Sequence, residues 1–81
     1  MNEFYTHLEI QVNSEGVKSC IPTIFDNLPD AKAKFYQVMS VAAVSGLPYH
    51  GSFVLRSDGV CIYGDKEVRA VEIPVEEEVE S

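Results

Sequence analysis

The first third of the chain alternates hydrophobic and polar side chains with a period of two. Between residues 4 and 12, Leu8, Ile10 and Val12 alternate with polar neighbours. This period places successive side chains on opposite faces of an extended segment, so the pattern predicts a half-buried β-strand. Residues 17–25 predict a second strand.

The segment between these two strands predicts a hairpin turn. It ends at Gly16, where a glycine suits a positive φ. A register that pairs Val12 with Val17 gathers nearly all the apolar side chains of the hairpin on one face. Because Pro22 has no N–H to donate to a ladder, we expect the second strand to lie at a sheet edge or to end there.

The central segment carries the signals of one α-helix, from about residue 29 to residue 45. Asn27 or Asp26 is the expected N-cap, and Pro29 suits the first turn. Gly46 is the expected residue just beyond the C-terminal end. The spacing of three and four residues predicts a buried stripe of Ala31, Phe35, Val38, Met39, Ala42 and Ala43.

A second hairpin follows the helix. Residues 49–56 predict a third strand and residues 60–64 a fourth. Between them, Asp58 and Gly59 favour a type I′ turn. Residues 68–75 are a candidate fifth strand at the sheet edge.

Together these elements predict an α+β domain of the order ββαββ, in which the helix covers the apolar face of an antiparallel sheet. Residues 1–75 form this single domain, and residues 76–81 form an acidic tail that we expect to extend into solvent. The side chains expected beneath the helix are Phe4, Leu8, Ile10, Ile21, Phe25, Phe53, Leu55 and Ile62. The other face, of mixed polarity, has no helix left to cover it.

Composition and charge narrow the possible functions. At 46% hydrophobic and 23% charged residues, the chain has the composition of a folded domain rather than of a disordered segment. The net charge of −7 arises from 13 acidic and 6 basic residues, and the acidic residues gather near the C-terminal end. Because nucleic acid binds to basic surfaces, direct nucleic-acid binding is disfavoured.

The sequence gives no sign of a targeting segment. The start lacks the basic and apolar regions of a secretory signal peptide, and the nearly apolar stretch of residues 38–47 is too short to span a bilayer. We therefore expect a cytoplasmic protein without membrane association and with reduced thiols.

Two histidines and two cysteines, His7, His50, Cys20 and Cys61, fall on the mixed face. The simplest interpretation is two partly exposed imidazoles and two small apolar side chains. The alternative is a metal or small-ligand site that uses all four. Phosphate-binding and nucleophile motifs are absent from the sequence, so it assigns no catalytic, cofactor-binding or metal-binding residue.

The mixed face is also rich in side chains favoured at protein interfaces, namely Tyr5, Tyr49, Val54, Arg56 and Tyr63. The predicted helix stripe is wider than one sheet face covers, because Tyr36, Val41 and Val44 extend it. Both features favour a partner, and we expect a homodimer or another protein partner.

A further pattern comprises Gly16-Val17-Lys18-Ser19, Ala33-Lys34-Phe35-Tyr36-Gln37-Val38, Ala42-Ala43-Val44-Ser45, Pro48-Tyr49-His50 and Leu55-Arg56-Ser57-Asp58-Gly59. This pattern resembles small uncharacterised proteins encoded in phage, prophage and other mobile regions of gut Firmicutes, over most of residues 4–64. The resemblance implies a bacterial cytoplasm or virion context and a small accessory role. It brings no known activity and no catalytic residue to transfer.

Three functional hypotheses follow from the sequence. The first is a non-enzymatic interaction or self-assembling accessory protein. The second is an acidic inhibitor or nucleic-acid mimic that occupies a basic partner through the acidic tail. The third is a small-ligand or metal-binding module. An enzyme is not expected, because no nucleophile, base and orienting group can be assembled from spacing alone.

Overall fold

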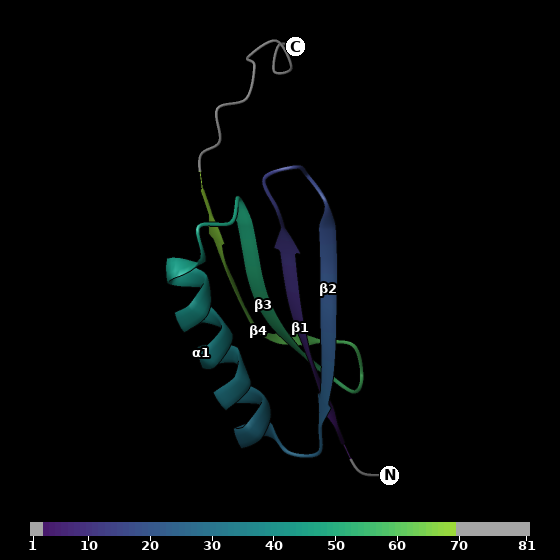
Figure 1. Cartoon of the computed structure of the whole chain (residues 1–81). Helices are drawn as coiled ribbons and strands as arrows, with labels where there is room; N and C mark the ends of the chain where they lie inside the picture. Colours follow the sequence, from purple (N-terminus) through teal and green to yellow (C-terminus); the bar gives the residue numbers. More distant parts are fainter. Residues whose placement is uncertain (1–2, 70–81) are drawn as a thin grey trace.

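The structure, a computed structural model, describes residues 3–69 as a four-stranded antiparallel sheet with one helix on one side of it (Figure 1). The elements are β1 (Tyr5–Val12), β2 (Lys18–Phe25), α1 (Leu28–Ser45), β3 (Tyr49–Arg56) and β4 (Cys61–Val68). The strand order is β2-β1-β3-β4. The predicted α+β fold of order ββαββ is therefore confirmed, and the two hairpins join into one sheet through β1 and β3.

The two edge strands differ in how well the sequence predicted them. The edge position expected for the strand containing Pro22 is confirmed, because β2 has β1 as its one neighbour. β4 is longer than predicted and continues to Val68, where the sequence suggested a fifth strand. The remainder of that candidate strand, residues 70–75, and the predicted tail, residues 76–81, lie outside the described residues.

The first hairpin has a three-residue loop rather than the four loop residues implied by a pairing of Val12 with Val17. Asn13 N–H donates to Val17 O at 3.0 Å, and Gly16 has a φ of 85°. The predicted pairing of Val12 with Val17 is therefore wrong by one residue, and Val12 pairs with Lys18. The Asn13 side chain accounts for the shift, because its Oδ1 also accepts the N–H of Val17 at 3.0 Å and fixes the shorter loop.

The second hairpin repeats this loop. Gly59 N–H donates to Arg56 O at 2.8 Å, Arg56 N–H donates to Val60 O at 2.8 Å, and Gly59 has a φ of 92°. Asp58 does not have a positive φ. A type I′ turn needs positive φ at both central residues, so that prediction is wrong, and the loop has three residues ending in glycine.

A β-bulge at Ile62 changes the register of the second hairpin. The predicted pairing of Phe53 with Gly64 is confirmed, but Leu55 pairs with Cys61 instead of Ile62. The extra residue lets Ile62 and Tyr63 both pack against the helix side. The bulge therefore supplies a second apolar side chain to the core from a strand that otherwise alternates.

The helix ends agree closely with the sequence prediction. The Oδ1 atom of Asn27 accepts the N–H of Asp30 at 2.9 Å, which makes Asn27 the N-cap, and Gly46 follows the last turn with a φ of 76°. The helix begins at Leu28. Its buried residues are Ala31, Phe35, Val38 and Ala42, whereas Met39 is half-buried and Ala43 is exposed.

In β1 and β3 the helix covers the face opposite to the predicted one, whereas in β2 the register shift keeps Ile21 and Phe25 on the helix side. The core contains Ala31 and Phe35 of the helix and Val54 of β3. The side chains packed against this core are Tyr5, Phe25, Met39, Ile62 and Tyr63. Only Phe25 and Ile62 of the predicted inner set belong to it. Strand alternation places Leu8, Ile10, Phe53 and Leu55 on the side without a helix.

Within residues 3–69, no helix combines the length and the apolar character needed to cross a lipid bilayer.

Candidate functional site

The sheet side without a helix is the most distinctive surface of the described residues. Strand register and alternation define it as four rows of four positions, which we call the open face. The rows, each from β2 to β4, are Ile24-Thr6-Leu55-Cys61, Pro22-Leu8-Phe53-Gly64, Cys20-Ile10-Gly51-Lys66 and Lys18-Val12-Tyr49-Val68. Most of these side chains are apolar, although no helix in the described part of the chain buries them.

Charge is almost absent from the open face. Its two charged side chains, Lys18 and Lys66, lie on the edge strands β2 and β4, and both central strands are uncharged there. The acidic strand residues Glu9, Asp65 and Glu67 occupy the alternate positions and point to the helix side. Residues 3–69 hold eight acidic and six basic residues, and none of the acidic ones occupies a position of the open face.

The centre of the open face is flattened by aromatic rings that lie over glycines. A Cβ atom added to Gly51 would lie 2.7 Å from Cε2 of Phe53 and 3.0 Å from Cε1 of Tyr49. A Cβ atom added to Gly64 would lie 2.9 Å from Cδ1 of Phe53. The two glycines therefore leave the room in which both rings lie down along the sheet, and the surface they form is apolar and low in relief.

The covered face holds a buried pair, His7 and Ser52, in place of the expected aliphatic core. Both side chains are fully buried, and His7 Nε2 lies 2.7 Å from Ser52 Oγ. Ser52 Oγ donates its proton to Phe35 O at 3.3 Å. The His7 Nε2–H group must therefore donate to Ser52, which leaves Nδ1 as the acceptor of a neutral imidazole.

This arrangement disfavours a charged His7. Its Nδ1 atom has no hydrogen-bond partner among the described residues, so protonation would bury an unsatisfied N–H. Burial and the nearby Lys34 ammonium lower the pKa of His7 below its ordinary value of 6.5, although Glu9 opposes them.

A second polar cluster joins the end of the helix to the sheet. His50 is 1% exposed, and its Nε2 lies 2.7 Å from Oε2 of Glu9, while its Nδ1 lies 3.1 Å from Oγ of Ser45. Gln11 Nε2–H also donates to Glu9 Oε2 at 2.9 Å. Burial opposes ionisation of Glu9, but the hydrogen bonds from His50 and Gln11 outweigh it and hold the pKa of Glu9 below its ordinary value of 4.5.

The order Ser45, His50, Glu9 resembles the relay of a hydrolase, but its surroundings favour a structural role. Ser45 lies in the last turn of the helix, where the negative end of the helix dipole opposes an oxyanion. Its hydroxyl also donates to Ala42 O at 3.3 Å. Because His50 is almost fully buried, a substrate has no access to the imidazole.

The sequence did not indicate that Arg69 caps the helix. Its Nη2 donates to Ala42 O at 2.8 Å and to Ala43 O at 2.9 Å, and its Nη1 donates to Leu47 O at 3.3 Å. These contacts satisfy carbonyl groups that the last helical turn leaves without partners. They also tie the end of β4 to the helix across 26 or more residues of chain, a relationship that no local pattern reveals.

The predicted interface residues Tyr5, Tyr49, Val54, Arg56 and Tyr63 do not share one surface. Of these, only Tyr49 lies on the open face. Val54 is fully buried in the core, so its assignment to an interface is wrong. Tyr5 and Tyr63 pack against that core, and Arg56 is engaged in the turn, where its Nη2 lies 2.7 Å from Oδ2 of Asp58.

The proposed cluster of histidines and cysteines does not form. His7 and His50 lie beneath the helix, whereas Cys20 and Cys61 are free and exposed on the open face, at opposite edges of the sheet. The prediction that all four share a face is wrong, because the one-residue register shift of β2 and the bulge at Ile62 place the two cysteines on the side opposite to the histidines. Within residues 3–69, no group of three or more histidine, cysteine or acidic side chains is placed to hold a metal ion.

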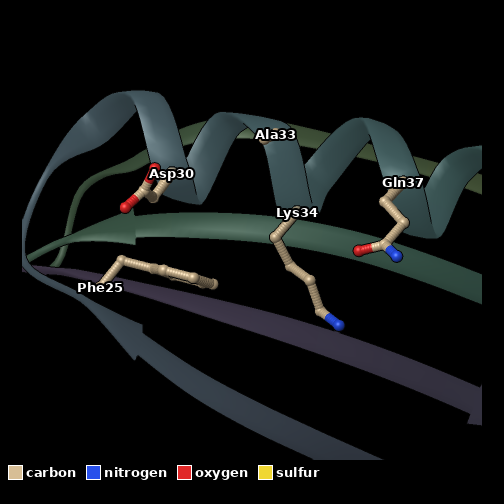
Figure 2. Close-up of a pocket in the computed structure, with 5 residues that line it drawn as sticks. All are labelled: Phe25, Asp30, Ala33, Lys34 and Gln37. Atoms are coloured by element: carbon tan, nitrogen blue, oxygen red, sulfur yellow. The ribbon is translucent and has the colours of Figure 1, made fainter.

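An open groove lies between the helix and β2, lined by Phe25, Asp30, Ala33, Lys34 and Gln37. Figure 2 shows Lys34 and Gln37 extending from the helix toward the strands, with Phe25 of β2 opposite them. The groove exists because the helix packs mainly over β3, β4 and β1 and leaves β2 less covered. Its mixed lining of one cation, one carboxylate and one amide defines no particular ligand.

Comparisons of this chain with models of protein families, with curated proteins and with solved structures give no significant match. Fold and surface define a two-layer α+β domain in which no helix of residues 3–69 covers one apolar sheet face. The functional conclusion therefore depends on that surface.

Proposed function

We propose that this protein is a small non-enzymatic interaction protein that binds another protein chain through its open face. The observation that carries the proposal is the pair of central strands, which present eight uncharged positions side by side. Monomeric proteins rarely expose contiguous apolar patches larger than a few hundred Å², and larger patches usually mark interaction sites. Depletion of charge is the compositional sign of an interface centre.

The small size of the core supports the proposal. The buried hydrophobic residues of the described chain are Ala31, Phe35, Val38, Ala42 and Val54, two of which are alanines. A domain of this length buries only about 60% of the surface of its unfolded chain. Covering the open face would bury the larger apolar side chains Leu8, Ile10 and Phe53, and so it would stabilise the fold.

The context we propose is a bacterial cytoplasm or a virion, where the protein would act as an accessory component. The resemblance to small proteins of phage and mobile regions supports this context. The protein would need neither a cofactor nor a metal for such a role, because binding rests on apolar burial.

Photo-crosslinking inside expressing cells tests the proposal. A benzophenone amino acid is placed at Tyr49, on the open face, in the full chain. The matched control places it at Tyr36, which is 56% exposed on the outer side of the helix. At each of the two positions, the benzophenone amino acid replaces a tyrosine and is a slightly larger aromatic side chain. The adducts are then identified by mass spectrometry.

We expect a protein adduct from position 49 and little or none from position 36. An adduct with a second copy or with a different protein would support the proposal in either case. Equal yields at both positions, or adducts from position 36 alone, would show that the open face is not the binding surface.

A further inference from the structure

We infer that the chain bound at the open face is a second copy of this protein, packed sheet against sheet about a two-fold axis. This inference rests on the proposed function and names its partner. Two sheets that pack face to face form the core of a β-sandwich, with side chains of the inner faces in contact across about 10 Å. The helices would then cover the two outer sides, giving four layers.

The area of the open face is close to that of the smaller specific dimer interfaces. Four strands about 4.8 Å apart and eight residues long, at about 3.4 Å per residue, give a projected area of about 500 Å². Accessible area follows the relief of the side chains and exceeds this projection. It therefore approaches the ~600 Å² per partner of the smaller specific interfaces.

The charges of the open face are compatible with self-association. A two-fold axis through its centre and parallel to the strands places Lys66 against Cys20 and Lys18 against Val68 of the second copy. An axis perpendicular to the strands places Lys66 against Gly64 and Lys18 against Ile24 of the second copy. In both arrangements no lysine meets a lysine, and the acidic strand residues point away from the interface.

The flat centre suits an identical flat surface. A two-fold axis brings the same patch of each copy into contact, so the patch must be complementary to itself. Phe53 and Tyr49 lie along the sheet over Gly51, rather than projecting from it. A low surface of this kind needs no matching cavity in its partner.

The sheet edges disfavour the other symmetric arrangement, in which two sheets join edge to edge. Pro22 lies within β2 and cannot donate to a further strand. At the other edge, β4 carries the bulge at Ile62 and the consecutive charges of Asp65, Lys66 and Glu67. A proline, a bulge and consecutive charges are features by which sheets avoid edge-to-edge pairing. The two central strands of the open face carry no such feature.

Sedimentation and light scattering of the full chain over a concentration series test the inference. We expect a species of twice the 9.0 kDa chain mass that dissociates on dilution. Ile10→Lys puts a charge near the two-fold axis in both copies. Because burying an unpaired charge is costly, this variant should dimerise more weakly by about a hundredfold or more. Val44→Lys, the matched control at a position that is 83% exposed on the helix, should leave the dimer unchanged.

Labelling of the native cysteines gives a readout that needs no substitution, in case Ile10→Lys fails to fold. Cys20 and Cys61 are exposed in a single copy and lie on the open face. We expect slow maleimide labelling at concentrations where the dimer forms and faster labelling after dilution. A monomer with reactive cysteines at every concentration would overturn the inference.

Two further outcomes would also overturn it. A monomer whose cysteines become reactive only when residues 70–81 are removed would assign the open face to that segment of the same chain. A monomer whose Tyr49 position crosslinks to a different protein in cells would assign it to that protein. In the latter case the proposed function stands and the second copy is rejected. If the protein neither dimerises nor crosslinks through position 49, both the proposed function and the inference are rejected.

Discussion

The imidazole of His50 and the carboxylate of Glu9, 41 residues apart in the chain, meet at 2.7 Å beneath the end of the helix. This contact joins β3 to β1 on the covered face, and Ser45 joins the same imidazole to the helix. Removing the carboxylate leaves a buried N–H without its acceptor. The pair therefore holds three elements in register although it contributes little apolar burial.

Glu9→Ala should lower the free energy of unfolding by about 1–3 kcal/mol, the range expected when a buried polar group loses its partner. Urea unfolding followed by circular dichroism at one fixed protein concentration measures this change. Glu15→Ala, at an exposed position in the first hairpin loop, is the control and should change stability by less than about 0.5 kcal/mol. Similar losses in the two variants would contradict the structural role of the pair.

Stability should fall as the pH decreases below about 6.5. Because the pKa of His7 is lowered in the folded state, the unfolded chain binds this proton first as the pH falls. The free energy of unfolding is therefore highest above pH 6.5 and decreases between that pH and the lower folded-state pKa. Glu9 adds a second decrease below pH 4.5, because its folded-state pKa is also lowered.

The variant His7→Gln separates the two steps of this pH profile. Glutamine has an N–H that can donate to Ser52 and does not titrate. Thermal unfolding is measured from pH 8 to pH 4. The melting temperature of the native chain should begin to decrease near pH 6.5, and that of the variant should decrease less. An unchanged profile in the variant would mean that His7 does not cause the first step.

The inverted faces show what the alternating pattern could and could not reveal. Alternation placed Leu8 and Ile10 on one side of β1 and His7 and Glu9 on the other, and the structure has this separation. The pattern does not state which side meets the helix. Burial of apolar area normally decides which face of a sheet a helix covers, so the sequence favours the more apolar side.

The polar side is buried because its polar groups find partners far away in the chain. His7 bonds to Ser52, 45 residues on, and His50 bonds to Glu9. Such pairing offsets the loss of hydration. The strands, the helix and its caps depend on neighbouring residues and were predicted well. The covered face depends on distant pairs, so spacing alone could not identify it.

The register of the first hairpin has a local signal in the sequence. The Oδ1 atom of Asn13 accepts the N–H groups of Glu15 and Val17, the Asx geometry that closes a short loop before Gly16. An asparagine three residues before a glycine thus favoured a three-residue loop. The bulge at Ile62 has no comparable sequence signal.

Asn27→Ala should destabilise the helix start by about 1 kcal/mol, because the Asn27 side chain accepts the N–H of Asp30 at 2.9 Å. For a chain of this length that corresponds to a decrease in melting temperature of about 4–8 °C. Differential scanning calorimetry measures it. Asp26→Ala, at the other residue that the sequence offered as a cap, should have a much smaller effect. A larger effect at Asp26 would contradict the observed cap.

Gly51→Ala tests whether flat aromatic rings matter for association. The new Cβ would lie 2.7 Å from Cε2 of Phe53, so the ring must move away from the sheet. We expect the dimer to weaken by about tenfold, which is about 1.4 kcal/mol and within the range of overpacking penalties. Sedimentation measures the association, and circular dichroism confirms that the fold is kept. In a Phe53→Leu background the contact at 2.7 Å is removed and the contacts with Tyr49 at 3.0 Å remain, so the same substitution should have a smaller further effect. An equal weakening in both backgrounds would show that the ring is not the cause.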